Sequence, residues 1–167
     1  MLPMKTADLL LVHGTSFVDR VIEVVSRSKY SHVAGIVKEN ELIESLGFRK
    51  TGYQGIDTYR GHSDLFTCDI LTDDQRKQIV QFAVKQVGTR YDYFLIAWEA
   101  EHFLLGVDVP FHEHGRFDCS TLWADAYRSV DVDLCPGIPF PTPGDLAKSK
   151  LLRKVGSFSP DKPNLHT

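Results

Sequence analysis

The stretch from Phe117 to Val130 constrains the fold most, because it places a cysteine where a helix begins. Asp118 has a side chain preferred at helix N-caps, so Cys119 would be the first helical residue. Apolar residues then recur at helical spacing, which predicts a buried face made of Leu122, Trp123, Ala126, Tyr127 and Val130. A helix N-terminus can lower the pKa of a thiol, so Cys119 is a candidate nucleophile. The alternative is a small buried hydrophobic residue.

The length and composition predict one globular domain. A chain of 167 residues is long enough to bury a core, and 43% hydrophobic with 25% charged residues is typical of a folded domain. We expect the domain to span residues 1–158, with the polar segment 159–167, which contains two prolines, as a flexible tail. A net charge of -3 argues against a nucleic-acid surface, which needs a basic stripe.

The sequence also bears on cellular location and thiol chemistry. No apolar run approaches the roughly 20 residues of a membrane span, and Met1 to Thr6 is too short and mixed for a secretory signal. We therefore expect a cytoplasmic protein with no integral membrane segment. An odd number of cysteines without a repeating spacing predicts reduced thiols. Cys68, expected in mid-strand, and Cys135, which precedes a proline, lack a helix N-terminus and are poor nucleophile candidates.

Strand and helix patterns alternate along the chain without repeats or a linker, which predicts an α+β fold. Alternating or β-rich runs predict strands over 8–13, 31–37, 41–46, near Tyr53, over 64–71 and over 151–158. Capping patterns predict helices that begin after Ser16, Thr72, Asp92 and Thr142, in addition to the Cys119 helix.

A nucleophilic cysteine needs a base, and the base needs a third group to orient it. His32 stands out among seven histidines because it lies in an expected strand, and Glu44 lies on the next strand of the same hairpin. A three-residue turn over Lys38 to Asn40 would put both side chains on one face of the sheet, whereas a two-residue turn would put them on opposite faces. The alternative is a histidine bonded to backbone beside a solvated glutamate.

Four motifs then occur in a fixed order: Ser31-His32-Val33, Leu42 to Ser45, Gly88 to Asp92, and Phe117 to Leu122. In this order the chain resembles the circularly permuted papain-like amidases of the NlpC superfamily, the group around the bacterial YiiX and YaeF proteins. Ordinary members have the cysteine helix before the histidine strand; here the histidine comes first, as in the permuted branch. The resemblance extends from Ala7 to Val155. It implies a permuted papain-like fold, with an antiparallel sheet packed against helices.

The resemblance also implies roles for six residues. Cys119 would be the nucleophile, His32 the general base and Glu44 the orienting group. Tyr91 matches the active-site tyrosine of the family and would bind the oxyanion or substrate, or would be an ordinary buried tyrosine. Asp118 and Ser120 flank the nucleophile, as in relatives that recognise a free amino group on a peptide; helix capping is their alternative role. The histidine-bearing insertion before Cys119 departs from the family pattern and puts the specificity pocket in doubt.

The expected function is that of a cysteine amidase or peptidase without a cofactor or metal, acting on a peptide or acyl amide, with cell-wall peptides first by resemblance. One alternative is a thiol-dependent acyltransferase or esterase on acyl or lipid substrates, because permuted papain-like folds include relatives of lecithin–retinol acyltransferase. Another is a binding module with the same fold. A third is a zinc site, for which the loop offers His102, His112, Glu113 and His114 near Cys119, without a CxxC or HExxH spacing.

Overall fold

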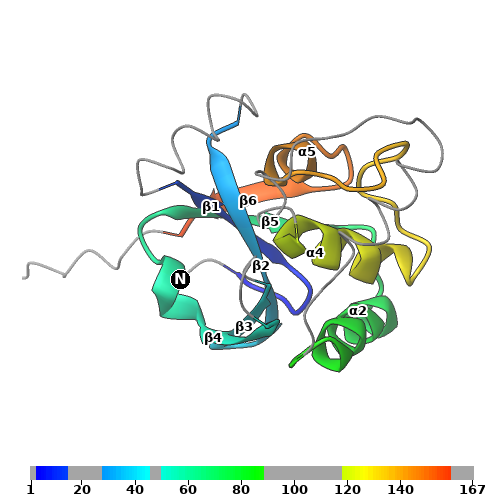
Figure 1. Ribbon diagram of the computed structural model, residues 1–167, viewed down its shortest axis with the longest axis horizontal. Coiled ribbons are helices and arrows are strands. Elements are labelled where there is room, and N and C mark those ends of the chain that lie inside the picture. The colour runs from blue at the N-terminus through cyan, green and yellow to red at the C-terminus, as the bar shows by residue number, and fades with distance from the viewer. Residues whose placement is uncertain (1–2, 15–27, 46–49, 89–117, 159–167) are drawn as a thin grey trace, which may run out of the picture.

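A six-stranded antiparallel sheet with the order β4-β3-β2-β1-β5-β6 forms the frame of the protein (Figure 1). The computed structural model describes residues 3–14, 28–45, 50–88 and 118–158. The strands are β1 (Leu9–His13), β2 (Tyr30–Lys38), β3 (Glu41–Glu44), β4 (Gly52–Gly55), β5 (Ser63–Thr67) and β6 (Arg153–Ser157).

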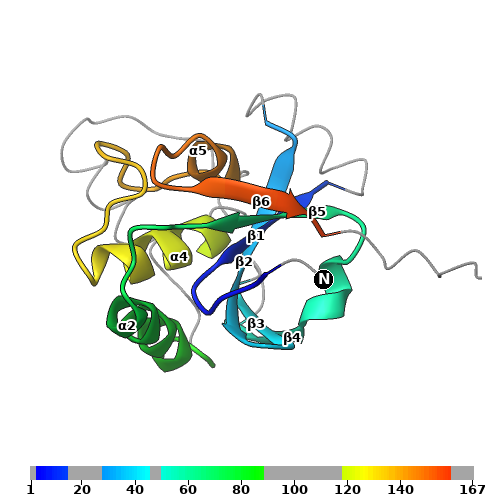
Figure 2. The same ribbon diagram turned by 180° about the vertical axis from the view of Figure 1, so that it is seen from behind.

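Three helices lie together beside the sheet in both the front and the back view (Figures 1 and 2). They are α2 (Asp73–Lys85), α4 (Asp118–Arg128) and α5 (Pro143–Ala147), and α4 packs against β2, α2 and α5. A short 3-10 helix, η1 (Ile56–Tyr59), follows β4. This arrangement confirms the predicted α+β fold, with an antiparallel sheet packed against helices.

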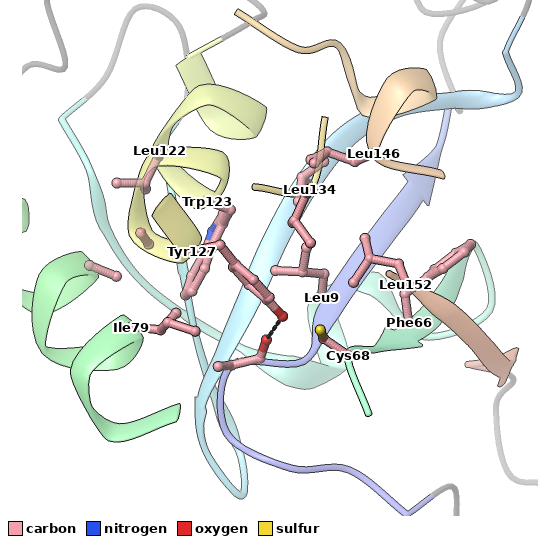
Figure 3. Packing of buried hydrophobic residues seen from close by; sticks show 14 of the residues in the cluster. Leu9, Phe66, Cys68, Ile79, Leu122, Trp123, Tyr127, Leu134, Leu146 and Leu152 are labelled. Carbon is pink, nitrogen blue, oxygen red and sulfur yellow. Dashed lines mark hydrogen bonds between the residues drawn. The ribbon is translucent and has the colours of Figure 1, made fainter. Parts of the chain in front are cut away.

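Strand residues alternate between two hydrophobic clusters, as the two-residue period of a strand requires. On the helix side, Leu9, Leu11 and Val33 pack against the apolar face of α4, and Figure 3 shows Trp123 and Tyr127 in this cluster. On the other side, a smaller cluster contains Leu10, Ala34, Ile36, Leu42, Leu65, Phe158 and Ile56 of η1. The predicted inner face of the cysteine helix is confirmed, since Leu122, Trp123, Ala126, Tyr127 and Val130 are all buried.

Two helix starts follow the sequence closely. Thr72 and Gln75 form a reciprocal capping box at the start of α2, and Thr142 and Asp145 do the same at α5, with Pro143 in the first turn. One expectation was wrong: β5 ends at Thr67, so Cys68 follows the strand rather than lying in its middle. The predicted helices after Ser16 and Asp92 and the predicted tail lie outside the described residues.

A buried ion pair joins the first strand to α2. Asp8, directly before β1, and Arg76 of α2 are both inaccessible to solvent or nearly so, and Arg76 Nη1 lies 2.8 Å from Asp8 Oδ1. The guanidinium also donates to the backbone oxygens of Thr6 and Cys68, and Thr67 donates its hydroxyl to the same carboxylate oxygen. Each member of the pair is therefore satisfied by several partners, as burial of charge requires.

The described helices contain no segment long and apolar enough to cross a membrane.

Candidate functional site

The β2–β3 hairpin places His32 and Glu44 on the same face of the sheet by a route that the sequence did not predict. Lys38 belongs to β2 and pairs with Glu41, so the connection has two residues, and the three-residue turn was wrong. However, the pairing shifts by one residue between Ile36 and Lys38, so that Gly35 lies opposite Ile43. This β-bulge adds one residue to β2 and restores the register that a three-residue turn would have given.

In this register, the side chains of His32 and Glu44 are diagonal neighbours on one face of the sheet. Since Gly35 pairs with Ile43, the next residue pair inward would be Ala34 and Glu44, and His32 lies two residues farther on the same face. His32 Nε2 lies 2.9 Å from Glu44 Oε2. Only 15% of the His32 side chain and 7% of the Glu44 side chain are exposed, so water competes weakly for this contact.

Helix α4 brings Cys119 to the same place. The helix begins at Asp118, one residue earlier than predicted, so Cys119 lies in its first turn and is 2% exposed. The helix is fixed over the hairpin by Trp123, whose indole Nε1 donates to the backbone oxygen of Ile43. The indole ring lies directly over Gly35, where a Cβ would come within 2.1 Å of ring atoms. Gly35 thus lets α4 approach β2 closely.

The structure therefore brings together Cys119, His32 and Glu44, which come from three separate elements. The Cys119 side chain hydrogen-bonds the His32 ring. Because Nε2 is the nitrogen that contacts Glu44, Nδ1 is the one left for the thiol. A histidine held between a thiol and a carboxylate can accept a proton on one side while the carboxylate stabilises the imidazolium on the other.

Cys119, His32 and Glu44 form a row of hydrogen-bonded side chains, and the electrostatics of this row favour a charged imidazole. Burial of His32 lowers its pKa, but this effect is outweighed by the charge of Cys119, the hydrogen bond to Cys119 and the hydrogen bond and charge of Glu44. Together they raise the pKa of His32 to about 10. The imidazolium is thus stabilised by both of its partners, Cys119 on one side and Glu44 on the other.

Tyr59 is a fourth member that the sequence reasoning missed. Its hydroxyl donates to Glu44 Oε2, the same oxygen that contacts His32. Its ring also lies beside the His32 ring, with centroids 5.7 Å apart. Tyr59 comes from η1, in a segment that the sequence predicted to be irregular, and no periodic pattern marks it.

The other predicted site residues are less well placed by the described structure. Ser120 follows Cys119 in α4 and is fully buried, and its predicted role in substrate binding stays a prediction. Asp118 is the first residue of α4, but its side chain lies outside the described part of the structure, as do Tyr91 and the histidine-rich loop with His102, His112 and His114.

Comparison with known proteins identifies the fold. No family model matches the sequence, and no curated protein matches it. Among solved structures, the chain is similar to the crystal structure of the metalloprotein YiiX from Escherichia coli O157:H7, a DUF1105 protein, with a TM-score of 0.54 and 15% sequence identity. The match covers 93% of this chain and 98% of that chain. The fold is YiiX-like. At this identity the likeness concerns the fold alone.

The description of YiiX as a metalloprotein raises the question of a metal in this chain. Within the ranges that the structure describes, no three or more histidine, cysteine, aspartate or glutamate side chains gather in a way that could hold a metal ion. His32 is also engaged by Glu44 at Nε2 and by a hydrogen bond with Cys119. The described residues do not fit a metal site.

Proposed function

We propose that this protein is a cysteine hydrolase that cleaves an amide bond, with Cys119 as nucleophile, His32 as general acid and base, and Glu44 as the orienting carboxylate. The observation that carries the proposal is the continuous hydrogen-bonded row from the Cys119 side chain through His32 to Glu44. The β2–β3 hairpin and α4, which are distant in the sequence, converge on it. A structural cysteine has no need of a nearly buried histidine and carboxylate aligned behind it.

In the acylation step, the Cys119 thiolate attacks the carbonyl carbon of the amide while His32 carries the proton. The carbonyl π electrons move to oxygen, and the resulting oxyanion would be held by the Cys119 backbone N–H at the start of α4. The C–N bond then breaks, and the leaving nitrogen takes the proton from His32. The products of this step are a free amine and a thioester on Cys119.

In the deacylation step, His32 accepts a proton from water, which attacks the thioester carbonyl. The C–S bond breaks, the carboxylic acid leaves, and the sulfur and imidazole return to the starting thiolate–imidazolium pair. Glu44 keeps the ring oriented and stabilises its positive charge in both steps. No cofactor or redox change is needed to balance this reaction.

The substrate class rests on the sequence resemblance. Peptide or isopeptide amides are the first choice, because the NlpC superfamily acts on cell-wall peptides. Helix α4 offers a positive N-terminus next to the thiol, which suits the developing oxyanion of any acyl substrate. Activity on esters of acyl chains but not on peptides would redirect the proposal to an acyltransferase or esterase.

The first experiment measures whether Cys119 is activated. Native protein and the His32→Ala variant are treated with iodoacetamide between pH 5 and 9, and labelling of each cysteine is followed by mass spectrometry. Cys68 and Cys135 are internal controls, because burial raises the pKa of both thiols, that of Cys135 to about 11. We expect fast labelling of Cys119 at pH 7 that is lost in the variant. Slow, equal labelling of all three would make Cys119 structural.

The second experiment measures turnover. Native protein is screened on fluorogenic peptide amides, isopeptide amides and acyl esters, beside Cys119→Ala, His32→Ala and the control Cys135→Ala. We expect amide cleavage to fall by about 10³-fold or more in the first two variants and to persist in the control. Unchanged melting temperatures would show that the folds are intact. Normal turnover by Cys119→Ala or His32→Ala would contradict the proposal.

A further inference from the structure

The hydroxyl of Tyr59 and the imidazole of His32 share one oxygen of Glu44. Tyr59 donates to Oε2, and His32 Nε2 lies 2.9 Å from that atom. Tyr59 is itself held in place, since its backbone oxygen accepts a hydrogen bond from the Ser63 hydroxyl and its ring packs edge-on against His62. The phenol is therefore a fixed donor aimed at the carboxylate behind the histidine.

In this contact the Tyr59 phenol is always the donor and Glu44 the acceptor. Burial raises the pKa of Tyr59. The hydrogen bond to Glu44, the charge of Glu44 and the charge of Cys119 raise the pKa of Tyr59 further. The hydroxyl thus keeps its proton throughout the range in which an enzyme works. An ionised carboxylate only accepts hydrogen bonds, so a neighbouring donor that keeps its proton favours the ionised form of Glu44.

We propose that Tyr59 is a positioning residue for the candidate site: it holds Glu44 ionised and turned toward His32, so that Cys119 keeps its reactivity at mildly acidic pH. The inference rests on the proposed function, because it assigns Tyr59 to the same row of residues. Tyr59 acts through Glu44 and does not touch the reacting sulfur.

A purely structural role would be different in kind. The Tyr59–Glu44 contact also ties η1 to β3, so its loss could lower stability without changing the site. Stability would then fall while the dependence of Cys119 reactivity on pH kept its shape. A positioning role instead changes that shape, because Glu44 without its donor becomes protonated at a higher pH and no longer supports the imidazolium.

The test compares Tyr59→Phe with native protein and with Tyr53→Phe. Phenylalanine keeps the ring beside His32 and removes only the hydroxyl; Tyr53 lies on β4 with its side chain 48% exposed and serves as the control. Iodoacetamide labelling of Cys119 is measured from pH 4.5 to 9. In Tyr59→Phe we expect the acidic limb to move up by about one pH unit, with labelling at pH 6 reduced about tenfold and labelling above pH 8 close to native. Tyr53→Phe should reproduce the native profile.

A profile of Tyr59→Phe that superimposes on the native one, or that is lowered equally at every pH, would overturn the inference. Chemical shifts of the His32 ring, followed by NMR over the same pH range, give a second reading that needs no thiol chemistry. We expect the acid step that reports protonation of Glu44 to move upward in Tyr59→Phe, and an unmoved step would overturn the inference as well.

These measurements separate the two proposals. Labelling and NMR use no substrate, so a shifted limb in a protein that cleaves no amide would support the role of Tyr59 and contradict the hydrolase. Amide cleavage with an unshifted limb would support the hydrolase and contradict the role of Tyr59.

Discussion

The protein contains two buried polar networks, and they use charge differently. One joins Asp8 to Arg76, with Thr67 and the backbone oxygens of Thr6 and Cys68 completing the set. The other runs from Cys119 through His32 to Glu44 and Tyr59. Both withdraw ionisable groups from water, and both satisfy them with several partners.

The difference lies in the protons. A guanidinium is protonated at every pH at which a protein folds, so the positive charge of Arg76 is permanent and its hydrogen bonds only hold elements together. In the Cys119 row, the thiol, the imidazole and the carboxylate can each hold or release a proton, whereas the Tyr59 phenol keeps its own. Burial and pairing alone therefore do not mark a candidate reactive site; groups that can exchange a proton do.

The substitution with the largest expected effect on stability is Arg76→Met, which disrupts the first network. It leaves the Asp8 carboxylate buried without its cation, and removal of one partner of a buried pair costs about 3–5 kcal/mol. We expect the free energy of unfolding in urea to fall by that amount, while iodoacetamide labelling of Cys119 under native conditions keeps its rate and pH profile.

Lys77→Met is the matched control, since Lys77 is the next residue of α2 and its ion pair with Asp74 is largely exposed. Its effect on stability should be within about 0.5 kcal/mol. A loss of Cys119 reactivity in folded Arg76→Met would show that the two networks are not independent.

Glu44→Gln tests the other network with the opposite expectation. The amide keeps the shape of the side chain but removes the charge that supports the His32 imidazolium. We expect Cys119 labelling and amide turnover at pH 7 to fall by about 10²-fold. Glu39→Gln, in the exposed turn of the same hairpin, should leave both unchanged. Native rates in Glu44→Gln would remove Glu44 from the site.

Gly35→Ala sharpens the comparison by disturbing the contact between β2 and α4, the helix that carries Cys119. The new Cβ would meet the Trp123 ring at 2.1 Å, so the helix must shift, at a cost of about 1–3 kcal/mol. Because Trp123 lies four residues after Cys119, we expect the shift to slow Cys119 labelling as well. Gly55→Ala is the control, since a Cβ there meets nothing within 4 Å. Native labelling in a destabilised Gly35→Ala would show that the thiol does not depend on this packing.

A further test is the slope of stability with pH. The pKa of His32 is raised from 6.5 to about 10 in the folded protein, so its contribution is complete below pH 6.5 and is lost as pH rises toward 10. We expect the free energy of unfolding to fall over this window in the native protein and in Arg76→Met, and to fall less in Cys119→Ala, where a main partner of His32 is gone. Equal slopes in all three proteins would contradict the assignment.

The sequence was informative where a residue lies in a strongly patterned element. Cys119 follows a capping residue and precedes a helical apolar stripe, and His32 is a polar residue in an apolar strand, so the sequence alone was enough to select both. Capping chemistry likewise predicted the starts of α2 and α5. The shared face of His32 and Glu44 was predicted correctly from the wrong turn, since a bulge supplied the residue that the turn lacked.

The features that the sequence could not supply depend on tertiary contacts. Arg76 lies on the same face of α2 as the buried Ile79 and Ala83, but an arginine is normally exposed, and only the arrival of Asp8 from another element makes its burial favourable. Tyr59 lies in a short 3-10 helix without a periodic pattern, and its role depends on its hydrogen bond to Glu44 on β3. Whether Tyr91, Asp118 and Ser120 contact substrate stays a prediction.

The tie between Trp123 and the hairpin also bears on how the protein protects its thiol. Trp123 contacts Gly35 of β2 and the backbone of Ile43 of β3, so α4 and both strands form one cooperative unit. A fluctuation that separates Cys119 from His32 must also displace the Trp123 indole from the hairpin. It therefore carries the free-energy cost of disrupting the core packing. Partly opened molecules that expose the Cys119 thiol to oxidants should consequently be rare.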